Sequence, residues 1–233
     1  LTVQVTTAFT QPFWGLVSDR IGKGTLVVWG PVLAICMIGM VGLAPGYAGI
    51  LLLVAVAGCG VAAFHPEGAA LAASASGAKQ AMGMAVFVVA GHFGLALGPS
   101  LAGQISERLG LHYTWLIIPP GLLLMLLVGR VLRPHARRMP TAPRGILRRA
   151  LQTQAPLFGL IFAISVLRSF VHIMYASGMP FWWDGLGLSA SEIGLLSGTF
   201  LFSGGLVGFA CGMMQKPGGE KPWIVWGFIL AIP

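Results

Sequence analysis

Apolar residues run through this chain in long blocks, and polar residues separate the blocks at short intervals. Five segments contain no Asp, Glu, Lys or Arg: 24–64, 80–106, 109–129, 150–167 and 193–215. A helix needs about 20 mainly apolar residues to cross the hydrocarbon core of a bilayer, and the first segment is long enough for two such helices. The pattern therefore predicts an all-α, polytopic membrane protein.

The polar interruptions place the spans along the chain. Short turns join most of them, so neighbouring helices are expected to be antiparallel. The first and last spans are incomplete and the chain begins without a methionine, so we expect a fragment of a longer protein. The approximate ranges of the predicted spans are 1–17, 25–43, 48–73, 81–103, 113–132, 154–177, 189–213 and 223–233.

Composition supports the same class. Charged residues make up only 9% of the chain and hydrophobic residues 56%, whereas soluble domains carry about 25% charged residues. The net charge of +8 does not indicate a nucleic-acid partner, because the charges lie in loops between apolar spans. The sequence has no phosphate-binding loop, paired catalytic carboxylates or metal-spaced His and Cys set, so we expect neither an enzyme nor a bound cofactor or metal.

The distribution of Lys and Arg predicts the orientation in the membrane. Most of these residues lie in or beside loops 18–24, 74–80, 133–153 and 214–222, and the remaining loops hold Arg108 alone. By the positive-inside rule, the four basic loops face the cytoplasm.

Segment 133–153 differs in composition from the short turns, since it is basic and contains several prolines. We interpret it as a cytoplasmic linker between an N-terminal bundle, 1–132, and the start of a second bundle, 154–233. Its arginines either lie on the anionic membrane surface or only set the topology.

The segment from Gly15 to Lys23, GLVSDRIGK, carries a recognisable pattern. The small residues Gly15 and Gly22 permit a tight turn and close helix approach, and Asp19 and Arg20 can make charge-assisted hydrogen bonds to helix ends. The segment resembles the G-x-L-x-D-R-x-G-R/K signature of the major facilitator superfamily, in which it is a conformational latch on the cytoplasmic side. Gly24 departs from the pattern, because a second basic residue is common there.

A second element, GLALGPSLAG, spans residues 94–103. Gly94 and Gly98, at a spacing of four, let two helices touch, and Pro99 removes a backbone donor and kinks a helix. The element resembles G-x-x-x-G-P-x-x-G-G in the fifth span of proton-coupled efflux members. Any close-packed membrane helix could use these glycines in the same way.

The resemblance covers the whole chain and implies a bundle of two six-helix halves, here incomplete, from span two to the start of span nine of twelve. Gln11-Pro12 and His65-Pro66-Glu67-Gly68 look most like the fosmidomycin-resistance group of efflux proteins. This group implies a bacterial inner-membrane protein that works on a small-molecule substrate and protons in the lipid bilayer, with no required oligomer.

Glu67 is the leading candidate for proton chemistry. A carboxyl group in a low-dielectric span can gain and lose a proton near neutral pH, and Pro66 frees the backbone carbonyl of Ala62. His65 is a second candidate, but it lies about 200° from Glu67 around the helix. Alternatively, Glu67 is a static partner of a buried cation or reaches water, and His65 only packs.

Arg168 and His172 lie four residues apart and so share a helix face. A guanidinium in lipid is costly, so Arg168 should point into the bundle toward an anion: Glu67, another carboxylate or an acidic substrate. A structural salt bridge is the alternative.

Together these features favour a secondary transporter that exports small organic compounds, with anions as one candidate class, in exchange for protons by alternating access. Proton-coupled uptake of a nutrient anion uses the same chemistry in reverse. A non-transporting scaffold or sensor on the same fold stays open.

Replacing Arg168 with Lys tests the anion role, since lysine keeps the charge but loses the planar bidentate donor. We expect Arg168→Lys to reach the membrane in normal amounts but to bind and transport an anionic substrate more weakly. Uptake into vesicles at matched protein content measures this. Transport equal to wild type would contradict the role.

Overall fold

The described part of the chain is built from helices. The computed structural model describes residues 2–21, 24–137, 152–214, 222 and 225–226, and these ranges contain no strand. The linker after residue 137 and the last predicted span, 223–233, lie almost wholly outside them. The long helices are α1 (Thr2–Ile21), α2 (Leu26–Gly39), α3 (Tyr47–Ala75), α4 (Gln80–Arg108), α5 (Ile118–Arg137), α7 (Ala155–Gly185) and α8 (Ala190–Met214); three short 3-10 helices are η1 (Val41–Leu43), η2 (Gly77–Lys79) and η3 (Leu111–Ile117).

Seven of the predicted spans correspond to these helices. Within the described residues, six segments are long and apolar enough to cross a membrane: Leu26–Leu43, Tyr47–Ala75, Met82–Arg108, Leu111–Leu132, Ala155–Gly185 and Ala190–Met214. The segment predicted as span 1–17 forms α1 but is not among the six, because threonine and glutamine lower its hydropathy. Helix α7 passes its predicted end at residue 177 and accommodates Pro180 within the helix.

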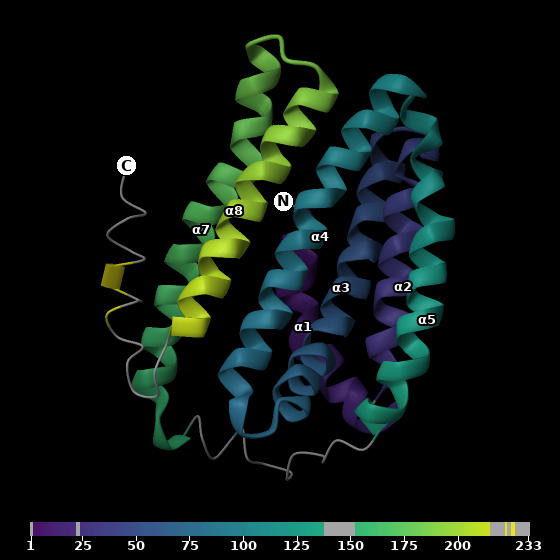
Figure 1. Cartoon of the computed structure of the whole chain (residues 1–233). Coiled ribbons are helices and arrows are strands. Elements are labelled where there is room, and N and C mark those ends of the chain that lie inside the picture. Colours follow the sequence, from purple (N-terminus) through teal and green to yellow (C-terminus); the bar gives the residue numbers. More distant parts are fainter. Residues whose placement is uncertain (1, 22–23, 138–151, 215–221, 223–224, 227–233) are drawn as a thin grey trace.

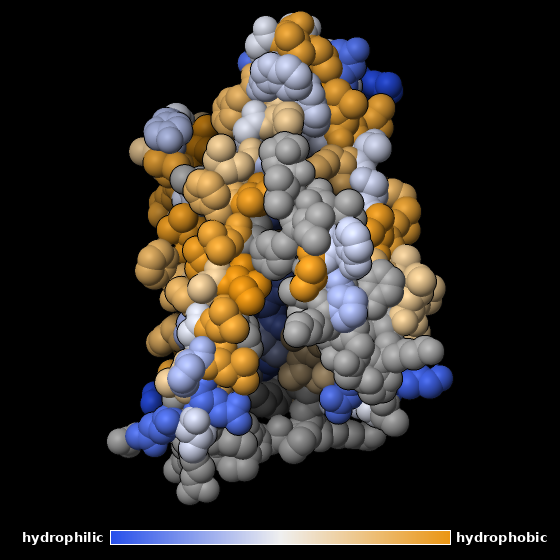
Figure 2. Space-filling model, turned by 90° about the vertical axis from the view of Figure 1, so that its left-hand side faces the viewer, coloured by the Kyte–Doolittle hydropathy of each residue, from blue (hydrophilic) through white to orange (hydrophobic). Residues whose placement is uncertain are grey.

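The surface of the bundle is that of an integral membrane protein. Large apolar side chains such as Phe9, Phe162 and Phe181 are 83%, 72% and 80% exposed, and their burial requires lipid or further helices. Figure 2 shows apolar residues over the middle of one side, with hydrophilic residues gathered toward its two ends.

Consecutive helices run in opposite directions, as the short turns predict (Figure 1). One end of the bundle carries Arg20, Lys79 and Arg130 and is called the basic end below. The opposite end, the far end, carries the turns between α4 and η3 and between α7 and α8. Helices α1 and α2 both pack on α3, and α4 packs along α8.

Helices α2 and α3 cross at two glycines. A Cβ on Gly30 would lie 2.6 Å from the carbonyl oxygen of Gly60, and a Cβ on Gly60 would lie 2.6 Å from the carbonyl oxygen of Gly30. Backbone atoms at this distance cannot move aside without moving a helix. Small residues therefore allow the close approach that packs membrane helices without a hydrophobic driving force.

Replacing Gly60 with Ala should separate α2 from α3. Overpacking costs about 1–3 kcal/mol, so we expect Gly60→Ala to lower the thermal denaturation midpoint of the purified full-length protein in detergent. Gly91→Ala is the matched control, because no atom lies within 4 Å of a Cβ at Gly91 in the described structure. Equal midpoints for the two variants would contradict the close crossing.

Candidate functional site

Glu67 lies inside the bundle at the side of α3 that faces α1 and α2. Its relative exposure is 1%, and it is among the largest fully buried side chains of the described residues. Burying a charge is costly unless the charge is paired and hydrogen-bonded. The surroundings of this carboxylate therefore decide whether the fold tolerates it.

Three donors converge on the Glu67 carboxylate. The Ser18 hydroxyl donates to Oε1 at 2.6 Å. The backbone N–H groups of Gly24 and Val27 donate to Oε2 at 3.1 Å and 2.8 Å. Hydrogen bonds to an ionised acceptor are roughly twice as strong as neutral ones, so these contacts fit the deprotonated form of the side chain.

The same carboxylate caps the start of α2. The first four N–H groups of a helix lack intrahelical partners, and Val27 is the second residue of α2. Thr25 stands at the N-cap but makes no side-chain capping bond. Glu67 supplies the missing acceptor from another helix and places its negative charge at the positive end of the helix dipole.

Gly24 makes this arrangement possible through its backbone. Its φ angle is +88°, a left-handed conformation that glycine adopts without a steric penalty. The residue that departs from the superfamily pattern therefore turns the chain so that its own N–H points at Glu67. Neither Gly24 nor Ser18 was predicted as a site residue; the available signal was a glycine two residues before the start of an apolar helix.

The other residues of the signature segment lie at or near the end of α1. Arg20 is exposed at the end of α1, and no atom lies within 4 Å of a Cβ at Gly15, so the predicted close approach at Gly15 is not seen in the described residues. Asp19 lies in α1, and Gly22 and Lys23 fall outside the described residues.

His65 faces a different side of α3 from Glu67, as the helical angle predicts. Its ring is 6.3 Å from the ring of Phe87 on α4 and 5.9 Å from that of Phe64. The helix continues through Pro66 from Tyr47 to Ala75. An aromatic contact accounts for the position of His65 and leaves its proposed role in transport a prediction.

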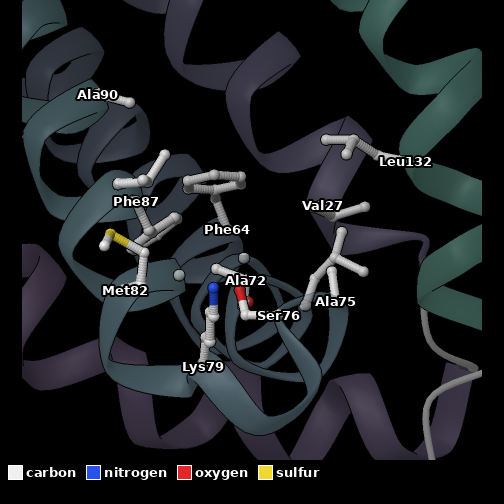
Figure 3. A pocket seen from close by; sticks show the side chains of 14 residues that line it. Val27, Phe64, Ala72, Ala75, Ser76, Lys79, Met82, Phe87, Ala90 and Leu132 are labelled. Atoms are coloured by element: carbon white, nitrogen blue, oxygen red, sulfur yellow. Dashed lines mark hydrogen bonds between the residues drawn. The ribbon is translucent and has the colours of Figure 1, made fainter.

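A cavity opens between α3, α4 and α5 near the basic end. Its volume is about 530 Å³, and its lining is mostly apolar, with Lys79 and Ser76 from the α3–α4 turn (Figure 3). Phe64, Gly68 and Leu71 line it, but Glu67 does not. The carboxylate of Glu67 lies between α1, α2 and α3, and its predicted place in a substrate cavity stays a prediction.

Arg168 and His172 both lie on α7. His172 is half-buried and has a partner within the structure, while the side chain of Arg168 is outside the described part. The three donors to Glu67 come from α1 and from residues 24–27, so none of them comes from α7.

The fifth-span element, residues 94–103, lies on α4. Its glycines Gly94 and Gly98 do not form the predicted contact with another helix in the described structure. Both Gly94 and Gly98 are exposed, with no atom within 4 Å of a Cβ at either in the described structure. The opposite face makes the close contact: the Pro99 carbonyl oxygen touches Gly194 of α8, and the Ala96 carbonyl oxygen lies 2.6 Å from a Cβ placed on Gly198. No group of three His, Cys, Asp or Glu within the described ranges could hold a metal ion.

Comparison with known proteins gives a consistent family. A model described as Major Facilitator Superfamily matches residues 2–233. The chain is 24% identical over 245 residues to the "Fosmidomycin resistance protein" of Escherichia coli (strain K12), covering 100% of this chain and 58% of that protein. No solved structure matches the chain.

Two relatives come from Bacillus subtilis (strain 168). The chain is 31% identical over 130 residues to the "Uncharacterized MFS-type transporter YfnC", covering 54% of this chain and 31% of that protein. It is 28% identical over 166 residues to the "Uncharacterized MFS-type transporter YwoD", covering 70% and 36% respectively. The chain thus spans at most about three fifths of the length of these relatives.

Replacing Glu67 with Gln should destabilise the fold. Glutamine offers one acceptor oxygen and directs an amide N–H₂ at a donor, and an unsatisfied buried donor costs roughly 1–3 kcal/mol. We expect a lower thermal denaturation midpoint for Glu67→Gln in detergent. Glu192→Gln, the same change at an exposed helix start, is the control, and equal midpoints for both variants would contradict the capping role.

Proposed function

Because the chain belongs to the Major Facilitator Superfamily, we propose that it is part of a secondary transporter that exports small organic compounds in exchange for protons by alternating access. The name of the Escherichia coli relative, "Fosmidomycin resistance protein", supports export of drug-like compounds. Membrane transport follows from the family; the direction, the proton coupling and the substrate are the proposal.

One observation carries the proposal: a fully buried carboxylate holds the superfamily signature segment to the start of the next helix. Ser18 lies within that segment, and Gly24 and Val27 follow it directly. The charge state of Glu67 is therefore coupled to the position of residues 18–27.

Protonation of Glu67 changes this network in a defined way. The carboxylate accepts from all three donors, whereas the neutral acid has one O–H donor and less acceptor capacity. A proton on Oε1 makes that oxygen a donor, so Ser18 must accept where it donated before; a proton on Oε2 faces two N–H groups that cannot accept it. A proton therefore loosens the attachment of the signature segment to α3, and its release restores it.

Three groups of the described residues donate to the Glu67 carboxylate. The donors come from a serine hydroxyl and two backbone amides, so none of these three contacts comes from a Lys, Arg or His side chain. Arg20, near the end of α1, is exposed. The proton and the backbone of residues 24–27 thus compete for the same oxygen atoms.

The substrate and the orientation are inferred from charge. Arg168 and His172 on α7 provide a cationic position for an anionic substrate, and Arg supplies a planar, bidentate donor. The basic end, with loops 18–24, 74–80, 133–153 and 214–222, faces the cytoplasm in this proposal, and the membrane is a bacterial inner membrane.

Solute-driven proton movement in proteoliposomes tests the proposal. We expect the full-length wild-type protein to move protons when fosmidomycin is added, and Glu67→Gln at equal reconstitution to lose that flux. Glu192→Gln, which removes an exposed carboxylate on α8, should keep it. A pH-sensitive dye inside the vesicles measures the flux.

The other outcomes separate the alternatives. Flux that persists in Glu67→Gln would assign Glu67 a purely structural role. Movement of the solute in the same direction as the protons would indicate proton-coupled uptake. Absence of flux with fosmidomycin and with a panel of small organic anions would favour a scaffold or sensor.

A further inference from the structure

The two halves of the chain meet along α4 and α8, which run antiparallel in close contact from the far end to the basic end (Figure 1). Helix α4 belongs to the predicted N-terminal bundle and α8 to the second bundle. Five glycines let the helices approach: Gly103 faces Ala190, Gly194 faces Pro99, Gly198 faces Ala96, Gly205 faces His92 and Gly212 faces Ala85. A movement of one half against the other would therefore change this contact.

Hydrogen bonds across this contact are concentrated at the far end. The Ser191 N–H donates to Oε2 of Glu107 at 2.9 Å, and the Ser100 hydroxyl lies 3.2 Å from the carbonyl oxygen of Gly194. Toward the basic end, the neighbours of Gly205 and Gly212 are carbon atoms of His92 and Ala85. Among the described residues, α4 and α8 are thus joined by directional bonds at the far end, and the close contacts at Gly205 and Gly212 toward the basic end are with carbon atoms.

Glu107 is the charged member of this set. It lies at the end of α4, and its carboxylate accepts a hydrogen bond from the Ser191 N–H, with the side chains of Ser191 and Ser189 close by. These groups form the start of α8, where a negative charge is favoured by the helix dipole. Its charged neighbour in the chain is Arg108.

A second carboxylate at the same place serves only α8. Glu192 accepts from the Ser189 N–H at 2.8 Å, and the Glu192 N–H lies 3.3 Å from the Ser189 hydroxyl. This is a capping box, and it already satisfies the helix start from within α8. The bond from Glu107 is therefore not required to form α8, but it joins α8 to α4.

We propose that Glu107 is a latch that holds the far end of the transporter closed, by binding the start of α8 from the opposite half. The inference rests on the proposed alternating access, in which the far end must open and close. Opening separates Glu107 from the start of α8, so that its oxygen atom and the Ser191 N–H bind water instead. Because Glu107 is solvent-exposed, the exchange is small in free energy, which suits a contact that breaks in every cycle.

Distance measurements between spin labels on the full-length, reconstituted protein test the latch. In a cysteine-free background, one pair of labels at Leu111 and Leu186 reports the far end, and a pair at Lys79 and Met214 reports the basic end; all four positions are exposed. We expect Glu107→Gln to raise the ratio of far-end-open to far-end-closed molecules by about two- to five-fold, the range for an exposed ionic contact. Glu107→Ala should raise it further.

Glu192→Gln is the matched control, since it removes the same charge from the same helix start without crossing between the halves. Two distance populations in wild type that neither Glu107 variant redistributes would overturn the latch while leaving alternating access intact. A single population at both ends, unchanged in every variant, would overturn both. An equal shift in Glu192→Gln would reduce Glu107 to a general effect of charge on α8 and overturn the latch.

Discussion

The arrangement of the N-terminal helices depends on one buried charge. Glu67 is fully buried, and the hydrogen bonds from Ser18, Gly24 and Val27 compensate for its loss of water. Each donor comes from a different position along the segment between α1 and α2, so the carboxylate fixes the end of α1, the turn and the start of α2 against α3 at once. The glycine crossing of α2 and α3 then brings the helices close enough for these bonds to form.

The fold was largely predictable because the length and apolarity of a segment indicate a membrane span. Neither property depends on which helices pack against that segment. Helices appear where the charge-free blocks predict them, and α7 differs mainly because Pro180 does not end it. The side of each helix that packs was harder to predict. Gly94 and Gly98 suggested one contact face of α4, yet α8 packs on the face of Ala96 and Pro99, since a near-uniformly apolar helix gives no periodic signal for the choice.

The candidate site was predictable in its residue but not in its surroundings. Burying a glutamate in an apolar span costs free energy, so such a residue indicates a functional role. Glu67 was predicted on this ground. Its partners are separated from it by 40 to 49 residues, and two of them are backbone N–H groups, which every residue but proline carries. No side-chain pattern could single them out; only the φ angle of Gly24 and the free start of α2 do so.

The position of the Glu67 cap also orders events during synthesis. Val27 is made 40 residues before its acceptor, and Thr25 does not cap α2 by itself. Until α3 has been made, the free amide groups in the first turn of α2 have only water or lipid headgroups as partners. The first turn of α2 therefore obtains its protein acceptor only when α3 packs against it.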